Sequence, residues 1–182
     1  MKKMIMAAAI VCAATFVHAA ACEWSLTGIQ SSDKTEAKAG SMVAYFMEGS
    51  TFDAFTALGG AEVGKYAVAN SLSSAKIQTS RTGASASGTF GTFSPGDQLS
   101  GYIVLFDSDT AESASSYAMT GVSTKDVPSA GNVKFAMAFG TDTVAKGWAT
   151  IPGGSTPGGV PEPTSGLLLV LGGAALALRR RR

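Results

Sequence analysis

Large apolar side chains alternate with small or polar ones along residues 133–139, and this is the clearest local pattern in the chain. A period of two predicts a strand with one buried face. Residues 101–106 are apolar at nearly every position and end at an acidic turn, so we expect a strand that is buried on both faces. Further strands are expected at residues 22–29, 42–47, 76–81, 89–93, 117–122 and 147–151.

One short helix is expected after residue 50. Ser50 can cap its first turn, and Asp53 follows three positions later. The glycine pair at residues 59–60 predicts the end of the helix. Its apolar face consists of Phe52, Phe55 and Leu58.

Turn signals at residues 94–97 and 129–132 separate the expected strands. Many short strands joined by Gly- and Ser-rich turns are typical of an antiparallel sandwich. We therefore expect a mainly β fold, with a small antiparallel β-sandwich-like domain and one short helix over residues 22–151. Residues 152–159 are rich in Gly, Pro and Ser and are interpreted as a flexible linker.

The first 21 residues are interpreted as a secretory signal peptide that forms an N-terminal signal helix. Lys2 and Lys3 precede an apolar stretch over residues 4–17, and small residues follow it. Cleavage after Ala19, with Val17 at the third position before the cut, fits the small-residue rule. Cleavage after Ala21 fits it equally well, and both sites stay open. The apolar stretch is shorter than the ~20 residues of a spanning helix, which argues against a retained anchor.

Cys22 follows three alanines, so a lipoprotein signal with an acylated Cys22 is a further alternative. Such signals usually carry Leu at the third position before the cysteine, where this chain has Ala19. Cys12 leaves with the signal peptide, so the exported protein would hold a single thiol and no internal disulfide. We expect Cys22 to be a free, partly buried cysteine.

The C-terminal segment, residues 160–182, combines three features in a fixed order. An extended, acidic tetrapeptide comes first, then the uncharged, helix-compatible segment 166–178, then a cluster of arginines. The helix is short for a bilayer, but it can insert if the bilayer thins, and the arginines would stay cytoplasmic. The tetrapeptide is Val160, Pro161, Glu162 and Pro163, and the cluster is Arg179, Arg180, Arg181 and Arg182.

These three features together resemble the PEP-CTERM sorting signal. The resemblance implies that residues 160–163 are the sorting and cleavage motif and that exosortase, a membrane-embedded transpeptidase-like enzyme, is the partner that processes the C-terminus. It also implies a C-terminal transmembrane sorting helix, a transient membrane association, and a cell surface that carries exopolysaccharide. An ordinary C-terminal anchor is the alternative.

The charges are segregated along the chain, which limits the possible partners. The net charge is +1, but residues 20–160 contain 8 basic and 12 acidic residues, a balance of −4. Nucleic-acid-binding domains are usually basic, so we expect no nucleic-acid partner.

His18 is the only histidine, and it lies in the signal peptide. The exported protein therefore lacks Ser-His-Asp and Cys-His nucleophile systems and histidine-ligated metal sites. We expect no catalytic residues, no metal site and no cofactor, and we expect the protein not to be an enzyme.

Two local patterns resemble ligand sites only weakly. Residues 59–65 match the spacing of a phosphate loop as far as Lys65, but Tyr66 replaces the hydroxyl residue that would hold magnesium, so we interpret them as a helix end and surface loop. Asp107, Asp109 and Glu112 could hold Ca²⁺, but the EF-hand pattern is incomplete. A solvated acidic turn is the simpler interpretation.

Two further hypotheses concern sugars. The aromatic residues Trp24, Trp148, Tyr45 and Tyr102 could form a sugar-stacking platform, although aromatic residues in strands are more often core. Glu48, Asp53 and Glu62 could supply the carboxylate pair of a glycosidase, although no spacing singles out a pair.

The function expected from the sequence is that of an exported, non-enzymatic surface or exopolysaccharide-associated protein, which an exosortase processes. The alternatives are a secreted carbohydrate-active enzyme with paired carboxylates, and a lipoprotein or permanent inner-membrane protein that faces the periplasm.

Overall fold

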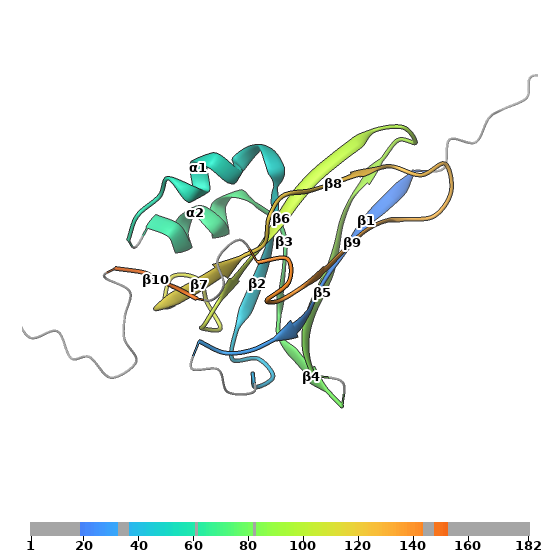
Figure 1. Cartoon of the computed structure of the whole chain (residues 1–182). Helices are drawn as coiled ribbons and strands as arrows, with labels where there is room; N and C mark the ends of the chain where they lie inside the picture. The colour runs from blue at the N-terminus through green and yellow to red at the C-terminus, as the bar shows by residue number, and fades with distance from the viewer. Residues whose placement is uncertain (1–18, 33–36, 61, 82, 144–147, 153–182) are drawn as a thin grey trace, which may run out of the picture.

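The computed structural model describes residues 19–32, 37–60, 62–81, 83–143 and 148–152. Two β-sheets pack face to face, and two helices cover the outer face of the second sheet (Figure 1). The fold is mainly β, as the alternating pattern predicts. The signal helix and the sorting helix of the sequence analysis lie outside the described residues. Across the described ranges, none of the helices has the length and apolar character needed to cross a membrane.

The first sheet has four strands in the order β4-β5-β1-β9. These strands are β1 (Ala20–Ile29), β4 (Gln78–Ser80), β5 (Gly83–Phe93) and β9 (Val133–Ala138). β1 pairs antiparallel with β5 but parallel with β9, where Cys22 lies opposite Val133. The alternation in β9 therefore predicts its buried face correctly, with Val133, Phe135 and Met137 buried, while the pairing direction differs from an all-antiparallel sandwich.

The second sheet has six strands, five of them in the order β10-β7-β6-β2-β3. They are β2 (Val43–Glu48), β3 (Ser71–Lys76), β6 (Gln98–Phe106), β7 (Ser116–Met119) and β10 (Ala149–Thr150). The sixth, β8 (Ser123–Asp126), pairs with the first half of β6. The predicted turn at residues 94–97 joins β5 to β6, where the Asp97 amide donates to the Ser94 carbonyl at 3.1 Å.

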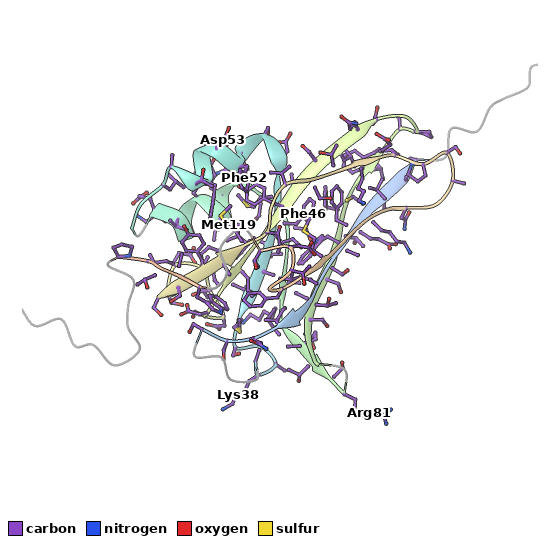
Figure 2. All side chains as sticks on the ribbon, viewed as in Figure 1. Lys38, Phe46, Phe52, Asp53, Arg81 and Met119 are labelled. Carbon is purple, nitrogen blue, oxygen red and sulfur yellow. The ribbon has the colours of Figure 1, made fainter. Side chains whose placement is uncertain are left out.

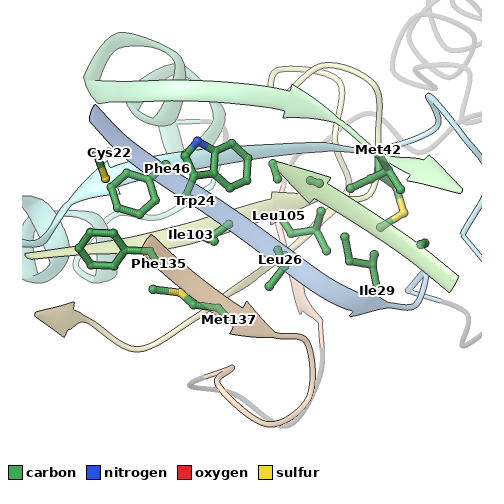
Figure 3. Close-up of a cluster of buried hydrophobic side chains, with 14 of the residues drawn as sticks. Cys22, Trp24, Leu26, Ile29, Met42, Phe46, Ile103, Leu105, Phe135 and Met137 are labelled. Carbon is green, nitrogen blue, oxygen red and sulfur yellow. The ribbon is translucent and has the colours of Figure 1, made fainter. Parts of the chain in front are cut away.

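The two hydrophobic clusters explain why β6 is buried on both faces. Ile103 and Leu105 point between the sheets, into a cluster that also contains Trp24 and Phe46 (Figure 3). Tyr102, Val104 and Phe106 point to the other side, into a cluster under the helices with Phe55 and Val63. A strand with apolar partners on both sides needs a continuous apolar sequence, and this confirms the prediction for residues 101–106.

The helical layer differs in part from the prediction. A short 3-10 helix (Gly49–Thr51) leads into α1 (Phe52–Thr56), so Thr51 and not Ser50 is the N-cap residue of α1. The Thr51 hydroxyl donates to the Glu48 carbonyl at 2.7 Å and leaves the helix without a side-chain cap. The predicted apolar face is confirmed, because Phe55 is buried and Phe52 and Leu58 pack against the same cluster.

The prediction of a single strand at residues 76–81 is wrong, because the chain changes sheets within this segment. β3 ends at Lys76 and belongs to the second sheet, whereas β4 begins at Gln78 and belongs to the first. Ile77 marks the crossing between the sheets, because its amide donates to the Met42 carbonyl at 3.0 Å and its side chain is fully buried.

Candidate functional site

An aromatic cleft opens between the two sheets at the end of the sandwich that carries the β5–β6 turn. Its volume is about 470 Å³, and we call it the aromatic cleft throughout. Apolar side chains dominate its lining, and three polar side chains complete it. The lining residues are Phe46, Leu72, Phe90, Gly91, Phe93, Leu99 and Phe135, and the polar residues are Glu48, Gln98 and Ser100.

A chain of ring contacts connects the core to the surface of this cleft. Phe46 stacks on Trp24 with ring centroids 6.2 Å apart and lies 4.9 Å from Phe90. Phe90 in turn meets Phe93 edge to face at 5.9 Å. Trp24 and Phe46 are fully buried, whereas Phe90 and Phe93 are half-buried, so the outer two rings present apolar surface at the cleft wall.

Two glycines create the space for these rings. A Cβ atom on Gly101 would lie 2.2 Å from the ring of Phe46, so only glycine lets that ring cross β6. Gly91 has a φ of +59°, which turns β5 at its end, and a Cβ there would lie 2.7 Å from the Phe93 ring. The turn at Gly91 explains how Phe90 and Phe93 reach one cleft from positions that a regular strand would place on opposite faces.

The cleft carries two polar groups of different kinds, one held by a hydrogen bond and one free. The side-chain nitrogen of Gln98 donates to a carboxylate oxygen of Asp126 in β8 at 3.1 Å, which holds the Gln98 amide in place. Glu48 is exposed, and it forms none of the ion pairs found among the described residues. Leu72 is also exposed, to 44%. The cleft thus combines apolar walls with a free carboxylate and an oriented amide, a composition typical of ligand-binding sites.

The acidic segment at residues 107–112 forms a structural turn. The Asp107 carboxylate accepts hydrogen bonds from the amides of Ser115 and Ser116, at 2.9 and 3.0 Å, and from the Ser115 hydroxyl at 2.7 Å. Asp109 forms an ion pair with Lys76 at 3.2 Å. Both carboxylates therefore have partners already, and no cluster of metal-ligating side chains occurs in the described part of the chain.

The four aromatic residues of the predicted sugar platform do not come together. Trp24 lies between the sheets and Tyr102 lies under the helices, and both are fully buried. Tyr45 packs edge to face on Phe106 at 5.8 Å, and Trp148 packs on Phe139 at 5.8 Å. Their role is core packing, which is the alternative that the sequence favoured.

Burial also shifts a pKa in the cluster under the helices. It raises the pKa of Tyr102, although the hydrogen bond with the Thr51 hydroxyl at 3.0 Å acts in the opposite direction.

The phosphate-loop-like segment is not a surface loop beyond residue 61. Glu62–Asn70 forms helix α2, which the sequence did not predict. Gly64 permits this helix to pack, because a Cβ atom there would lie 2.3 Å from the Ala111 carbonyl oxygen. Lys65, the residue that would contact a phosphate, forms an exposed ion pair with Glu62 at 3.1 Å.

The three carboxylates of the glycosidase hypothesis lie on three different elements. Glu48 ends β2, Asp53 is in α1 and Glu62 begins α2. Asp53 lies on the outer side of α1, away from Phe46 (Figure 2). Glu48 is the one member of this set that lines the aromatic cleft.

The cleft residues Phe90, Phe93, Leu72 and Leu99 were not singled out by the sequence analysis. The available signal was the spacing of Phe90 and Phe93 around Gly91, which breaks the strand period. Leu72 gave a weaker signal, because it stands among serines in a segment with no apolar alternation.

The sorting motif (Val160, Pro161, Glu162 and Pro163) and the arginine cluster (Arg179 to Arg182) lie outside the described residues. Residues 159–182 match the family model of the PEP-CTERM protein-sorting motif. The chain carries a PEP-CTERM sorting domain. This confirms the resemblance on which the C-terminal prediction depends. No curated protein and no solved structure shows significant similarity to the chain.

A PEP-CTERM motif implies export, membrane-linked sorting and then the cell surface, with processing by exosortase, a membrane enzyme. The part of the domain that leads toward this motif is β10 and Pro152. β10 lies beside the helical layer, at the end of the molecule opposite the β5–β6 turn and the start of β1 (Figure 1). The aromatic cleft therefore lies at the end of the domain opposite β10.

Proposed function

We propose that this PEP-CTERM protein is a non-enzymatic surface protein whose domain binds exopolysaccharide through the aromatic cleft after exosortase has cleaved the chain near residues 160–163. The observation that carries the proposal is the composition and place of the cleft. Its walls are the exposed parts of Phe90 and Phe93, and its lining also holds Glu48, Gln98 and Ser100.

The chemistry of the cleft suits a sugar chain. The C–H faces of a pyranose ring pack on aromatic and aliphatic side chains, while its hydroxyl groups need donors and acceptors at the edge. The cleft combines both kinds of side chain.

The position of the cleft supports the same role. A domain that is attached through its C-terminal linker exposes its opposite end to the surroundings. The aromatic cleft is at the end of the domain opposite β10, so attachment of the processed C-terminus to the cell surface would leave the cleft open to polysaccharide.

The alternative is a carbohydrate-active enzyme. Glycoside hydrolysis normally uses two carboxyl groups that flank the scissile bond. Among the residues that line the aromatic cleft, Glu48 is the only carboxylate. This favours binding over hydrolysis.

The test uses the processed protein purified from cells that contain the exosortase, with the exopolysaccharide of the same cells as ligand. We expect saturable binding by isothermal titration calorimetry, and we expect Leu72→Ser to weaken it about 3- to 10-fold through loss of apolar contact area. Val68→Ser is the matched control, because Val68 is also 44% exposed but lies on α2, outside the cleft.

Two outcomes would reject the proposal. Equal binding by the Leu72 and Val68 variants would place the polysaccharide elsewhere on the domain. Release of reducing sugar ends by the wild-type protein, abolished by Glu48→Gln, would identify an enzyme.

A further inference from the structure

The start of β1 bears on a question that the sequence leaves open, namely which bond the signal peptidase cuts. Cleavage after Ala19 and cleavage after Ala21 both satisfy the small-residue rule. The two products differ by only two residues, Ala20 and Ala21. In the structure these two residues belong to β1, whereas Ala19 precedes the strand.

Ala20 and Ala21 are integral to the first sheet. Ala20 pairs with Phe93 and Ala21 pairs with Thr92 in the antiparallel ladder with β5. The Ala21 amide also donates to the side-chain oxygen of Asn132 at 3.3 Å. Ala20 is 2% exposed and belongs to the hydrophobic cluster between the sheets, whereas Ala19 is exposed and precedes the strand.

Cys22 is buried more deeply than Ala20 and Ala21 and is paired with strands on both sides. Its side chain is fully buried, and its backbone lies between Phe90 of β5 and Val133 of β9. A lipoprotein would need a diacylglyceryl group on Sγ and an acylated amine on the same residue. Both groups would have to leave the space between the sheets, so lipidation at Cys22 and the observed packing of β1 exclude each other.

We infer that the signal peptide is removed by hydrolysis of the Ala19–Ala20 peptide bond and that Ala20 is the unmodified N-terminal residue of the exported protein. The step consumes one water molecule, leaving a carboxylate on Ala19 and an ammonium group on Ala20. The peptidase acts on the unfolded chain, so the fold does not direct the cut. The product of the Ala19 cut keeps all of β1, whereas a cut after Ala21 removes its first two paired residues.

Two substitutions separate the possible cleavage sites. Val17 is the third residue before the Ala19 site and is absent from the product of either cut, so Val17→Gln impairs the Ala19 cut without any effect on the folded domain. Ala21 is the last residue before the alternative site, and its side chain is half-buried, so Ala21→Gln impairs the Ala21 cut with the polar group directed toward solvent. We expect Val17→Gln to accumulate precursor or shift the cut, and Ala21→Gln to leave the N-terminus at Ala20.

The readout is N-terminal sequencing and intact mass of the protein from exosortase-bearing cells. The expected N-terminus is a free Ala20, and Cys22→Ala should leave both the cut and the yield unchanged. A free Cys22 terminus, a lipid mass on Cys22, or a retained segment before Ala19 would each overturn the inference. The C-terminal mass is read in the same spectrum, so a failure of this inference is distinguishable from a failure of exosortase processing or of sugar binding.

Discussion

Replacement of Gly101 by alanine tests how the aromatic cleft is built. The new methyl group would lie 2.2 Å from one ring carbon of Phe46 and 3.0 Å from the Met47 carbonyl oxygen. Phe46 has little freedom to move, because Trp24, Phe90 and Phe135 contact its ring with centroids 6.2, 4.9 and 5.1 Å away. The clash must therefore be relieved by displacement of packed rings or of β6 itself.

The expected magnitude follows from two opposing effects. Overpacking a well-filled core costs about 1 to 3 kcal/mol. Replacing glycine by alanine restricts the unfolded chain and returns about 0.4 to 1 kcal/mol. The steric cost is larger, so Gly101→Ala should destabilise the domain by about 1 to 2 kcal/mol. This corresponds to a fall in Tm of roughly 4 to 8 °C for a domain of this size.

Thermal and urea unfolding of the processed protein, followed by circular dichroism, would measure this loss. Gly59→Ala is the matched control, because Gly59 is exposed and has no atom within 4 Å of the added methyl group. That control should be neutral or slightly stabilising. The double variant with Phe46→Leu should be more stable than the sum of the single effects predicts, because leucine makes room for the methyl group. Equal stabilities for the two alanine variants, or strict additivity in the double variant, would refute this account of the cleft.

Three further predictions concern other parts of the chain. Burial raises the pKa of the Cys22 thiol to about 11. The contribution of Cys22 to stability should therefore be constant up to about pH 8 and fall by about 2 to 3 kcal/mol by pH 11, because the unfolded thiol ionises first. Urea unfolding of the wild type and of Cys22→Ala at several pH values would measure this difference, which the variant should lack. Chelation with EDTA should leave Tm unchanged, because the Asp107 carboxylate is already satisfied by three hydrogen bonds, and a fall restored by Ca²⁺ would contradict this. Replacement of residues 161–163 by alanine should leave uncleaved protein in the inner membrane, whereas replacement of the arginines at residues 179–182 by serine should release full-length protein. Cell fractionation and intact mass distinguish these outcomes. A native protein that keeps its four arginines would contradict exosortase cleavage.

The strands that the sequence predicted well are those whose pattern depends on burial alone. Residues 101–106 are apolar throughout because two clusters cover β6, one on each face. Residues 133–139 alternate because only one face of β9 is covered. Burial patterns of this kind do not encode direction, and so the parallel pairing of β9 with β1 could not be read from them.

The elements that the sequence missed are those whose formation depends on a distant partner. β3 and β8 are short and mostly polar, and they become strands because β2 and β6 offer them hydrogen-bonding edges. α2 follows two glycines and has a glycine of its own, Gly64, which lowers its intrinsic helix propensity. The contact between Gly64 and the backbone at Ala111 is a tertiary feature that no local pattern reports.

The candidate site was missed for a related reason. Sequence reasoning selected four aromatic side chains, of which Trp24 and Tyr102 are fully buried and Tyr45 and Trp148 are half-buried against other rings. The side chains that line the cleft are those that a local irregularity moved to the edge of the core. Phe93 is the clearest case, since the positive φ of Gly91 brings it back toward Phe90 after the strand period is broken.

The positions of the start of β1 and of β10 determine which end of the domain an attachment at either terminus would cover. Ala20 pairs with Phe93, which is a wall of the aromatic cleft, so the N-terminal end of β1 and the cleft lie together. β10 lies at the opposite end of the molecule. A membrane tie at the N-terminus by a retained signal helix would hold the cleft against the bilayer. Attachment of the processed C-terminus to the cell surface would turn the cleft outward. The inferred cut between Ala19 and Ala20 is therefore a condition for the proposed binding of exopolysaccharide, and a variant with an uncleavable signal should fold normally yet fail to retain polysaccharide.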